Sequence, residues 1–235
     1  MCYLSLMKRN KNNCDLKSCS LCKGCLKEWL PALDANRKTF NFKKGEVLFT
    51  EGEEVTGIYY LVSGKAKVHK KWAEDKELIV RFAGAGDIIG HRGLGKETIY
   101  PVSATAIEAV TACFIDLDFF FATLKVNHDY AFNLLMFYAE ELQESEKRMT
   151  NLAHMTVKAR MAYGILKLKE KFGVSDTGEL NITISRNDLA AYNGTTYETA
   201  FRVMNEFEKD NVVIFSKEGL SIIDEEMLKK TVSSK

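Results

Sequence analysis

Residues 182–202 read ITISRNDLAAYNGTTYETAFR, and this stretch decides the fold of the C-terminal part of the chain. Ser185 suits the N-cap of a short helix, with Asp188 at its third position in a capping-box-like arrangement. Residues 190–194 predict a turn that ends in glycine, and a second helix is expected from about residue 196 to residue 210. A helix, a tight turn and a second helix predict a helix-turn-helix.

The segments on either side extend this motif to a domain of residues 156–235. An amphipathic helix is expected over residues 157–172, before the motif. Apolar residues at 212–215 and 220–223, separated by Gly219, predict a small hairpin after it. The combination predicts a winged helix-turn-helix, which is a DNA-binding fold.

Upstream, residues 127–155 contain neither Gly nor Pro, and their apolar residues recur at helical spacing. A heptad-like stripe with four-residue and three-residue steps is formed by Leu135, Ala139, Leu142, Met149 and Ala153. This pattern predicts one long helix, within a segment of residues 123–155, that pairs with its own copy in a homodimer. The alternative is that the stripe packs on the preceding domain. Glu146 occupies the one seam position that breaks the pattern, where it would face its twin.

Residues 39–119 are punctuated by glycine and alternate between apolar and polar side chains. Short β-rich runs of this kind indicate an antiparallel sandwich or roll, which we place at residues 37–122. The predicted fold class is therefore α+β: an antiparallel β-roll, a long dimerisation helix and a C-terminal winged helix-turn-helix.

The 33 Lys and Arg residues nearly balance the 32 Asp and Glu residues, which leaves a formal charge of +1. Any nucleic-acid contact must then depend on a few placed residues and not on a broadly basic surface. No apolar run approaches the roughly 20 residues that span a bilayer, and the first nine residues are too short for a signal peptide. We expect a cytoplasmic protein without a membrane partner.

Four of the six cysteines, Cys14, Cys19, Cys22 and Cys25, fall within 12 residues in a segment of residues 1–36. In a reducing compartment such a cluster favours a metal or redox centre over disulfides. The two-residue gaps between Cys19, Cys22 and Cys25 match the first three ligands of a [4Fe–4S] cluster, which takes a fourth cysteine from elsewhere. Four thiolates can also hold a structural zinc ion, and a segment without metal is the third possibility. Cys2 is expected to be incidental.

Taken together, the roll, the long helix and the winged helix-turn-helix resemble the CRP/FNR family of bacterial transcription regulators over about residues 39–223. The resemblance is closer to the FNR branch than to the cyclic-AMP branch. Its motifs are Lys44-Gly45-Glu46, Gly52, residues 58–62 with Gly64, residues 86–90, and residues 196–202. It implies a cyclic-nucleotide-binding-like roll, a homodimer, a palindromic site on double-stranded DNA, and RNA polymerase as a further partner.

The resemblance places the second helix of the motif in the major groove and implies Glu198 and Arg202 as its base-reading pair. Arg can donate two hydrogen bonds to guanine, and Glu can accept one from the cytosine amino group. It also implies that Arg186 and Asn187 hold phosphate. Thr196, Tyr197 and Thr199 complete the expected DNA-binding set. Tyr197 stands where the cyclic-AMP branch has a base-reading Arg, and Phe201 where the FNR branch has Ser.

The roll departs from the cyclic-AMP branch at its effector positions, which read Gly90-His91 and Tyr100-Pro101. The carboxylate that holds ribose and the Arg that neutralises the cyclic phosphate are both absent, so we do not expect cyclic AMP to bind. His91 and Tyr100 are the candidate residues of any other effector pocket, including one for haem.

The resemblance to the FNR branch also implies Cys113 as the remote fourth cluster ligand, with Cys14 as an alternate. We expect a regulator that responds to oxygen, nitric oxide or redox state through an iron–sulfur centre. The alternative is a regulator with a small-molecule or haem effector in the roll and a structural zinc or metal-free cysteine segment. A third hypothesis, a cyclic-nucleotide-type module that binds proteins, is disfavoured by Glu198 and Arg202. No Ser/His/Asp or Cys/His arrangement suggests an enzyme, and residues 90–97 lack the Ser or Thr that a P-loop needs.

Overall fold

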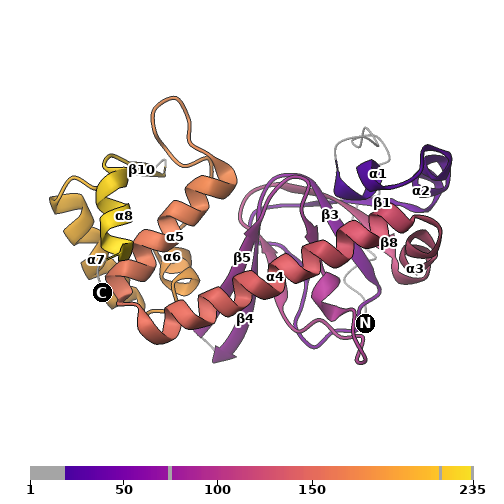
Figure 1. The fold of residues 1–235 in the computed structure, drawn as a ribbon, viewed down its shortest axis with the longest axis horizontal. Helices are drawn as coiled ribbons and strands as arrows, with labels where there is room; N and C mark the ends of the chain where they lie inside the picture. Colours follow the sequence, from indigo (N-terminus) through magenta and orange to yellow (C-terminus); the bar gives the residue numbers. More distant parts are fainter. Residues whose placement is uncertain (1–18, 74–75, 217–218, 234–235) are drawn as a thin grey trace. The chain divides into compact units, whose positions relative to one another are not determined.

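The computed structural model describes residues 19–73, 76–216 and 219–233, so Cys2 and Cys14 lie outside the described residues. The chain divides into two compact units, Met1–Lys70 with Val80–Glu141, and Lys71–Ile79 with Leu142–Lys235. Figure 1 shows the β-rich part, the long helix α4 and the mainly helical C-terminal part in chain order. The predicted fold class is confirmed.

Short strands form two four-stranded sheets, with the orders β1-β8-β3-β6 and β2-β7-β4-β5. Their bounds are β1 Lys38–Phe42, β2 Val47–Phe49, β3 Gly57–Ser63, β4 Ala66–Ala73, β5 Lys76–Ala83, β6 Ile88–Ile89, β7 Ser103–Ala106 and β8 Val110–Asp116. Strands β3 and β8 pair antiparallel with Tyr60 opposite Cys113, so these two side chains lie on the same face of the sheet.

The core of the roll is continuous, and Ile58, Tyr60 and Leu61 on β3 are fully buried in it. Tight turns between strands depend on glycine. Gly64 has a φ of +81°, and a Cβ built there would lie 2.0 Å from the carbonyl oxygen of Ala109, so no other residue fits this turn.

Two short helices, α1 (Ser20–Gly24) and α2 (Leu30–Asn36), and the 3-10 turn η2 (Lys27–Trp29) precede the roll. A second 3-10 turn, η3 (His91–Gly93), follows β6. The roll is followed by α3 (Leu117–Val126), whose N-cap Asp116 accepts a hydrogen bond from the Phe119 backbone N–H. The domain boundary that we predict between residues 122 and 123 therefore falls inside α3.

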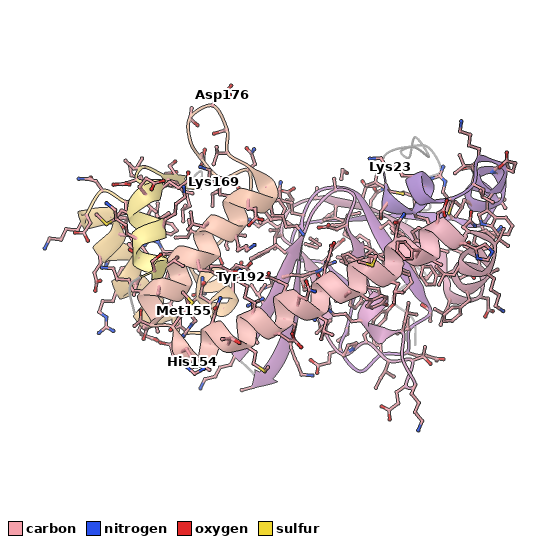
Figure 2. All side chains as sticks on the ribbon, viewed as in Figure 1. Lys23, His154, Met155, Lys169, Asp176 and Tyr192 are labelled. Carbon is pink, nitrogen blue, oxygen red and sulfur yellow. The ribbon has the colours of Figure 1, made fainter. Side chains whose placement is uncertain are left out.

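The long helix α4 spans His128–His154, in agreement with the expected helix. Asn127 separates it from α3, because its side-chain amide donates to the Thr123 carbonyl while its own carbonyl accepts from the Ala131 N–H. Figure 2 shows His154 at the end of α4 and Met155 in the short link to α5.

The C-terminal unit has the predicted winged helix-turn-helix order. Its elements are α5 (Val157–Phe172), α6 (Arg186–Tyr192), α7 (Tyr197–Lys209), the hairpin β9 (Val213–Phe215) with β10 (Leu220–Ile222), and α8 (Glu225–Ser233). Ser185 is the N-cap of α6 and accepts from the Asp188 N–H, as predicted. The turn is shorter than the predicted residues 190–194, because α6 continues to Tyr192.

Helix α8 was not predicted from the sequence, although it packs against α5 through the buried Leu228. Within the described residues, none of the helices combines the length and the apolar character that crossing a bilayer requires.

Candidate functional site

The second helix of the motif, α7, has one buried and one exposed face. Thr196 caps its N-terminus by accepting a hydrogen bond from the Thr199 backbone N–H at 3.3 Å. Ala200, Val203, Met204 and Phe207 are buried, and they hold the helix against the rest of the unit. Glu198 and Arg202 lie one turn apart on the opposite, exposed face. The capping and the apolar face therefore present the predicted pair outward.

Both side chains are accessible, and the environment of Glu198 favours its charged form. Hydrogen bonds from its own backbone N–H and from the Thr196 hydroxyl lower the pKa of Glu198. The alternative role of Arg202, a surface ion pair with Glu198 or Glu206, is absent among the described residues. Glu206 instead pairs with Lys158 at 3.0 Å. A carboxylate acceptor and a free guanidinium fork are thus available at one surface.

Arg186, expected to hold phosphate, lies against this helix. Its guanidinium carbon is 5.5 Å from the centre of the Phe201 ring and 5.4 Å from that of Phe215, and its Nη2 is 3.9 Å from a Glu208 carboxylate oxygen. The neighbouring Asn187 is exposed. The structure therefore brings Arg186 next to the base-reading candidates and fixes its side chain between two rings.

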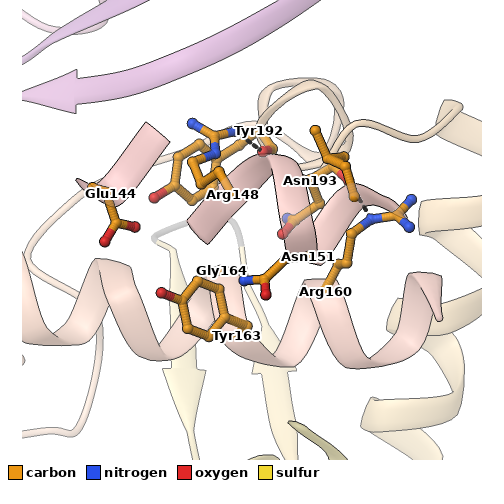
Figure 3. Close-up of a pocket in the computed structure, with 9 residues that line it drawn as sticks. Glu144, Arg148, Asn151, Arg160, Tyr163, Gly164, Tyr192 and Asn193 are labelled. Carbon is orange, nitrogen blue, oxygen red and sulfur yellow. Dashed lines mark hydrogen bonds between the residues drawn. The ribbon is translucent and has the colours of Figure 1, made fainter. Parts of the chain in front are cut away.

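Two arginines that the sequence did not single out secure the motif (Figure 3). The guanidinium of Arg160 donates to the carbonyls of Met155, Asn193 and Gly194, which joins the link before α5 to the turn between α6 and α7. Arg148 on α4 donates to the Tyr192 carbonyl at 2.7 Å. The pocket that they line has room for about two water molecules. Because most of their partners, the carbonyls of Tyr192, Asn193 and Gly194, are distant in sequence, no motif could have revealed them.

In the roll, the effector candidates His91 and Tyr100 line one small cavity. Its free space accommodates about one water molecule. The Tyr100 ring stacks on Phe49 with centroids 4.1 Å apart, and its hydroxyl donates to the Gly57 carbonyl at 3.0 Å. Tyr100 is therefore held in place beside a cavity that has room for little more than a water molecule.

His91 is 2% exposed, and neither ring nitrogen has a hydrogen-bond partner among the described residues. Burial lowers its pKa. Its Nε2 lies 3.8 Å from the carboxylate of Glu141 on α4, which also binds Arg81 at 3.0 Å and Arg92 at 2.6 Å. Burial raises the pKa of Glu141, but His91 and the two arginines outweigh it and hold that pKa well below its usual value. This carboxylate ties α4 to the roll.

The cysteine segment folds back onto the roll. Cys19 caps α1 by accepting from the Cys22 N–H at 3.4 Å, and both residues are buried. Burial and the nearby Cys19 raise the pKa of Cys25 to about 12. Cys113 is buried on β8, and none of the four described cysteines forms a disulfide.

A pair of buried tyrosines lies at the place where the two cysteine-bearing segments meet. Cys19 and Cys113 both lie near enough to Tyr60 to contribute to its raised pKa, although burial is the main cause. The Tyr60 hydroxyl is hydrogen-bonded to that of Tyr130 on α4. Among the described residues, no three His, Cys, Asp or Glu side chains are grouped closely enough to hold a metal ion. Cys14 lies outside these residues.

The fold and the exposed face of α7 define a DNA-binding regulator with a sensor-type roll. Comparison with known families agrees: a cyclic nucleotide-binding domain matches residues 39–127, and a Crp-like helix-turn-helix domain matches residues 159–231. The chain belongs to the CRP/FNR family, whose members are transcription regulators.

Its relatives include both branches of the family. The transcriptional activator protein Anr of Pseudomonas protegens is 26% identical over 224 residues, 92% of this chain and 91% of the relative. The cAMP-activated global transcriptional regulator CRP of Salmonella typhimurium is 29% identical over 180 residues, 75% of this chain and 84% of the relative. Among solved structures, FixK2 of Bradyrhizobium japonicum has the same fold, with a TM-score of 0.74 at 22% identity over 85% of this chain and 98% of that one.

Proposed function

We propose that this protein is a homodimeric regulator that binds a palindromic DNA site and responds to oxygen, nitric oxide or redox state through an iron–sulfur centre. The observation that carries the dimer is an apolar stripe on α4. Phe132, Leu135, Leu142 and Met149 follow heptad spacing, and each is more than 60% exposed in the single chain. Large side chains exposed in such a row are typical of a helix that pairs with another helix.

The exposed pair on α7 supports sequence-specific binding. The Arg202 guanidinium can donate two hydrogen bonds to guanine O6 and N7, and the Glu198 carboxylate can accept from a cytosine amino group. A twofold dimer presents two copies of this face, so the site is a palindrome. We place this activity in the cytoplasm, with RNA polymerase as the downstream partner and no catalytic role.

The contacts of the cysteine segment support its role as the sensor. The Leu26 backbone N–H donates to the Asn127 side chain at 2.8 Å, and the Trp29 indole N–H donates to the Thr123 hydroxyl at 3.2 Å. Both acceptors are buried at the corner between α3 and α4. The segment therefore contributes hydrogen bonds to the start of the dimerisation helix, and a change in its conformation would be felt there.

Further contacts strengthen the same junction. The Trp29 ring stacks on Phe119 with centroids 5.8 Å apart. A Cβ added to Gly24 would lie 2.8 Å from the Tyr130 ring, which shows how closely α1 packs on α4. The cysteine segment and the start of α4 are thus packed together within the first unit.

The donor set suits a [4Fe–4S] cluster, which thiolates of four cysteines hold and which supplies an oxidant-sensitive centre when bound. We propose Cys19, Cys22, Cys25 and Cys113 as its ligands, with Cys14 as the alternate. The segments that carry Cys19 and Cys113 already meet at Tyr60. Binding requires these thiols to draw closer together than they are in the described structure.

The second candidate signal is a small molecule or haem in the roll, with zinc or no metal in the cysteine segment. The ring nitrogens of His91 favour it, because they are buried and make no hydrogen bond within the part of the chain that the structure describes. The Salmonella relative is named as cAMP-activated, but here the roll cavity beside Tyr100 has room for about one water molecule, and the positions that the resemblance assigns to the cyclic nucleotide read Gly90-His91 and Tyr100-Pro101. We propose the iron–sulfur signal because the cysteine segment reaches α4 directly.

Anaerobic purification of the full chain followed by an absorbance scan and metal analysis tests the signal. The proposal predicts a brown protein with roughly four iron atoms per monomer. Cys19→Ser and Cys113→Ser should lose the iron, whereas the matched control Cys2→Ser should keep it. Stoichiometric zinc, a haem absorbance band, or iron that survives both substitutions would refute it.

A further inference from the structure

Two exposed aromatic rings stack along α7 beside the base-reading pair. The centroids of Tyr197 and Phe201 are 5.9 Å apart with 25° between the ring planes. Tyr197 is 44% exposed and Phe201 37% exposed, although both are large and apolar. Each ring precedes one member of the pair Glu198 and Arg202, so the aromatic row runs parallel to the charged row on the exposed side of the helix.

The row is held in place by contacts that extend beyond α7. The Arg186 guanidinium lies over the Phe201 ring at 5.5 Å and over the Phe215 ring of β9 at 5.4 Å. Arg186 is in turn near the Glu208 carboxylate. The Phe201 ring is therefore held by a cation–π contact with Arg186 as well as by stacking on Tyr197. The rings therefore form a rigid apolar surface, and little rotamer freedom is lost when a ligand contacts them.

The chemistry of the major groove indicates what such a surface selects. Of the four bases, only thymine presents an apolar group there, its C5-methyl, and apolar side chains make contact with it. Glu and Arg on the neighbouring row have no partner for that methyl, since they read hydrogen-bonding groups. An aromatic row next to them complements thymine beside the G·C pair.

We propose that Tyr197 and Phe201 are specificity-determining residues that select thymine, through its C5-methyl, at positions adjacent to the G·C pair read by Glu198 and Arg202. This inference rests on the proposed DNA-binding function. It assigns the bases next to that pair, which Glu198 and Arg202 do not contact in the proposed complex.

The test begins with selection of double-stranded DNA from a random-sequence library by the full-length dimer. The selected half-site should contain thymine next to the guanine. Deoxyuridine is then substituted for each such thymine, which removes only the methyl group. Affinity should fall about fourfold for one methyl and on the order of 15-fold when both half-sites are changed, the loss expected for one methylene-sized apolar contact in each.

Phe201→Ala should abolish the difference between thymine and deoxyuridine while preference for the guanine persists. Phe201→Leu, which keeps an apolar side chain, should retain part of the difference and provides the measurement if the Ala variant does not fold. The matched control Ile214→Ala removes another exposed apolar side chain and should leave the difference unchanged.

Selected half-sites without thymine beside the guanine would overturn the inference, as would equal affinity for deoxyuridine in the wild-type protein. Failure of the proposed function is distinguishable, because then no sequence is enriched and Arg202→Ala leaves DNA affinity unchanged.

Discussion

Leu142→Gln should weaken the homodimer strongly without disturbing the helix that carries it. Leu142 lies in the apolar stripe of α4 and is 62% exposed in the single chain. Gln has nearly the same helix propensity as Leu, so α4 should persist. The substitution removes an apolar side chain from the predicted seam and puts in its place an amide that prefers water.

The size of the effect follows from the exposed fraction. Complete burial of a Leu side chain stabilises by roughly 1.5–3 kcal/mol, so burying the exposed portion of Leu142 is worth about 1–2 kcal/mol per protomer. A twofold dimer buries two copies, which gives about 2–4 kcal/mol in all. The dimer Kd should then rise roughly 30- to 700-fold, at about 1.4 kcal/mol for each factor of ten.

Sedimentation equilibrium of the anaerobically purified protein measures this Kd directly. The control is Met227→Gln on α8, which makes a comparable change at a side chain that is 43% exposed but lies off the stripe. It should leave the Kd unchanged. An unaltered Kd for Leu142→Gln, or equal weakening by both variants, would show that α4 does not form the seam.

Three further substitutions test other parts of the structure. Glu146→Leu should tighten the dimer, because it removes two like charges that would face each other in the seam. DNA affinity should then depend less on oxidation state, which fluorescence anisotropy titrations in air and under nitrogen measure. Gly164→Ala should destabilise the C-terminal unit by about 1–3 kcal/mol in thermal unfolding, since its Cβ would lie 2.3 Å from Asn193 Oδ1, whereas Gly95→Ala, with 3.9 Å to the nearest atom, should be neutral. The pKa of His91 is lowered in the folded protein, so as the pH falls the unfolded chain takes up this proton first, and the free energy of unfolding should decline below about pH 6.5. His91→Gln should flatten this decline. The pKa of Glu141 is also lowered, so the loss of stability that its protonation causes should appear only below about pH 4.5.

Local chemistry explains which elements could be predicted from the sequence. The caps Ser185 and Thr196 act through neighbouring N–H groups, so the starts of α6 and α7 can be located from residue type alone. Helix α8 has two acidic residues at its start but only one buried side chain, Leu228, which gives too weak an apolar pattern to predict it. The Asn127 side chain at the break between α3 and α4 also accepts from the Leu26 N–H, a partner about one hundred residues away that no local pattern could reveal.

The candidate site shows the same division. Glu198 and Arg202 could be proposed because residues 196–202 resemble a known recognition helix, and the structure places both on one exposed helix face. Arg160 could not, because its guanidinium binds carbonyls that only the folded chain brings together. His91 sits in a glycine-rich turn, which predicts exposure to water, yet Phe137 and Tyr138 of α4 enclose its ring. Long-range packing, which no local pattern encodes, determines the surroundings of Arg160 and His91.

If the cysteine segment is the sensor, as we propose, its coupling to the dimer would depend on the corner between α3 and α4. Asn127 accepts from the cysteine segment through its side-chain oxygen while its amide group donates to Thr123, so one side chain serves both the segment and the helix break. Tyr130, in the first turn of α4, is hydrogen-bonded to Tyr60 on β3, and Tyr60 lies opposite Cys113 on the paired strand β8. In the proposed mechanism, a change at the cysteines would reach α4 through these two residues, which precede the exposed stripe residue Phe132 in sequence. Because Asn127 and Tyr130 lie outside that stripe, substituting them should alter the response to the signal more than the strength of the seam.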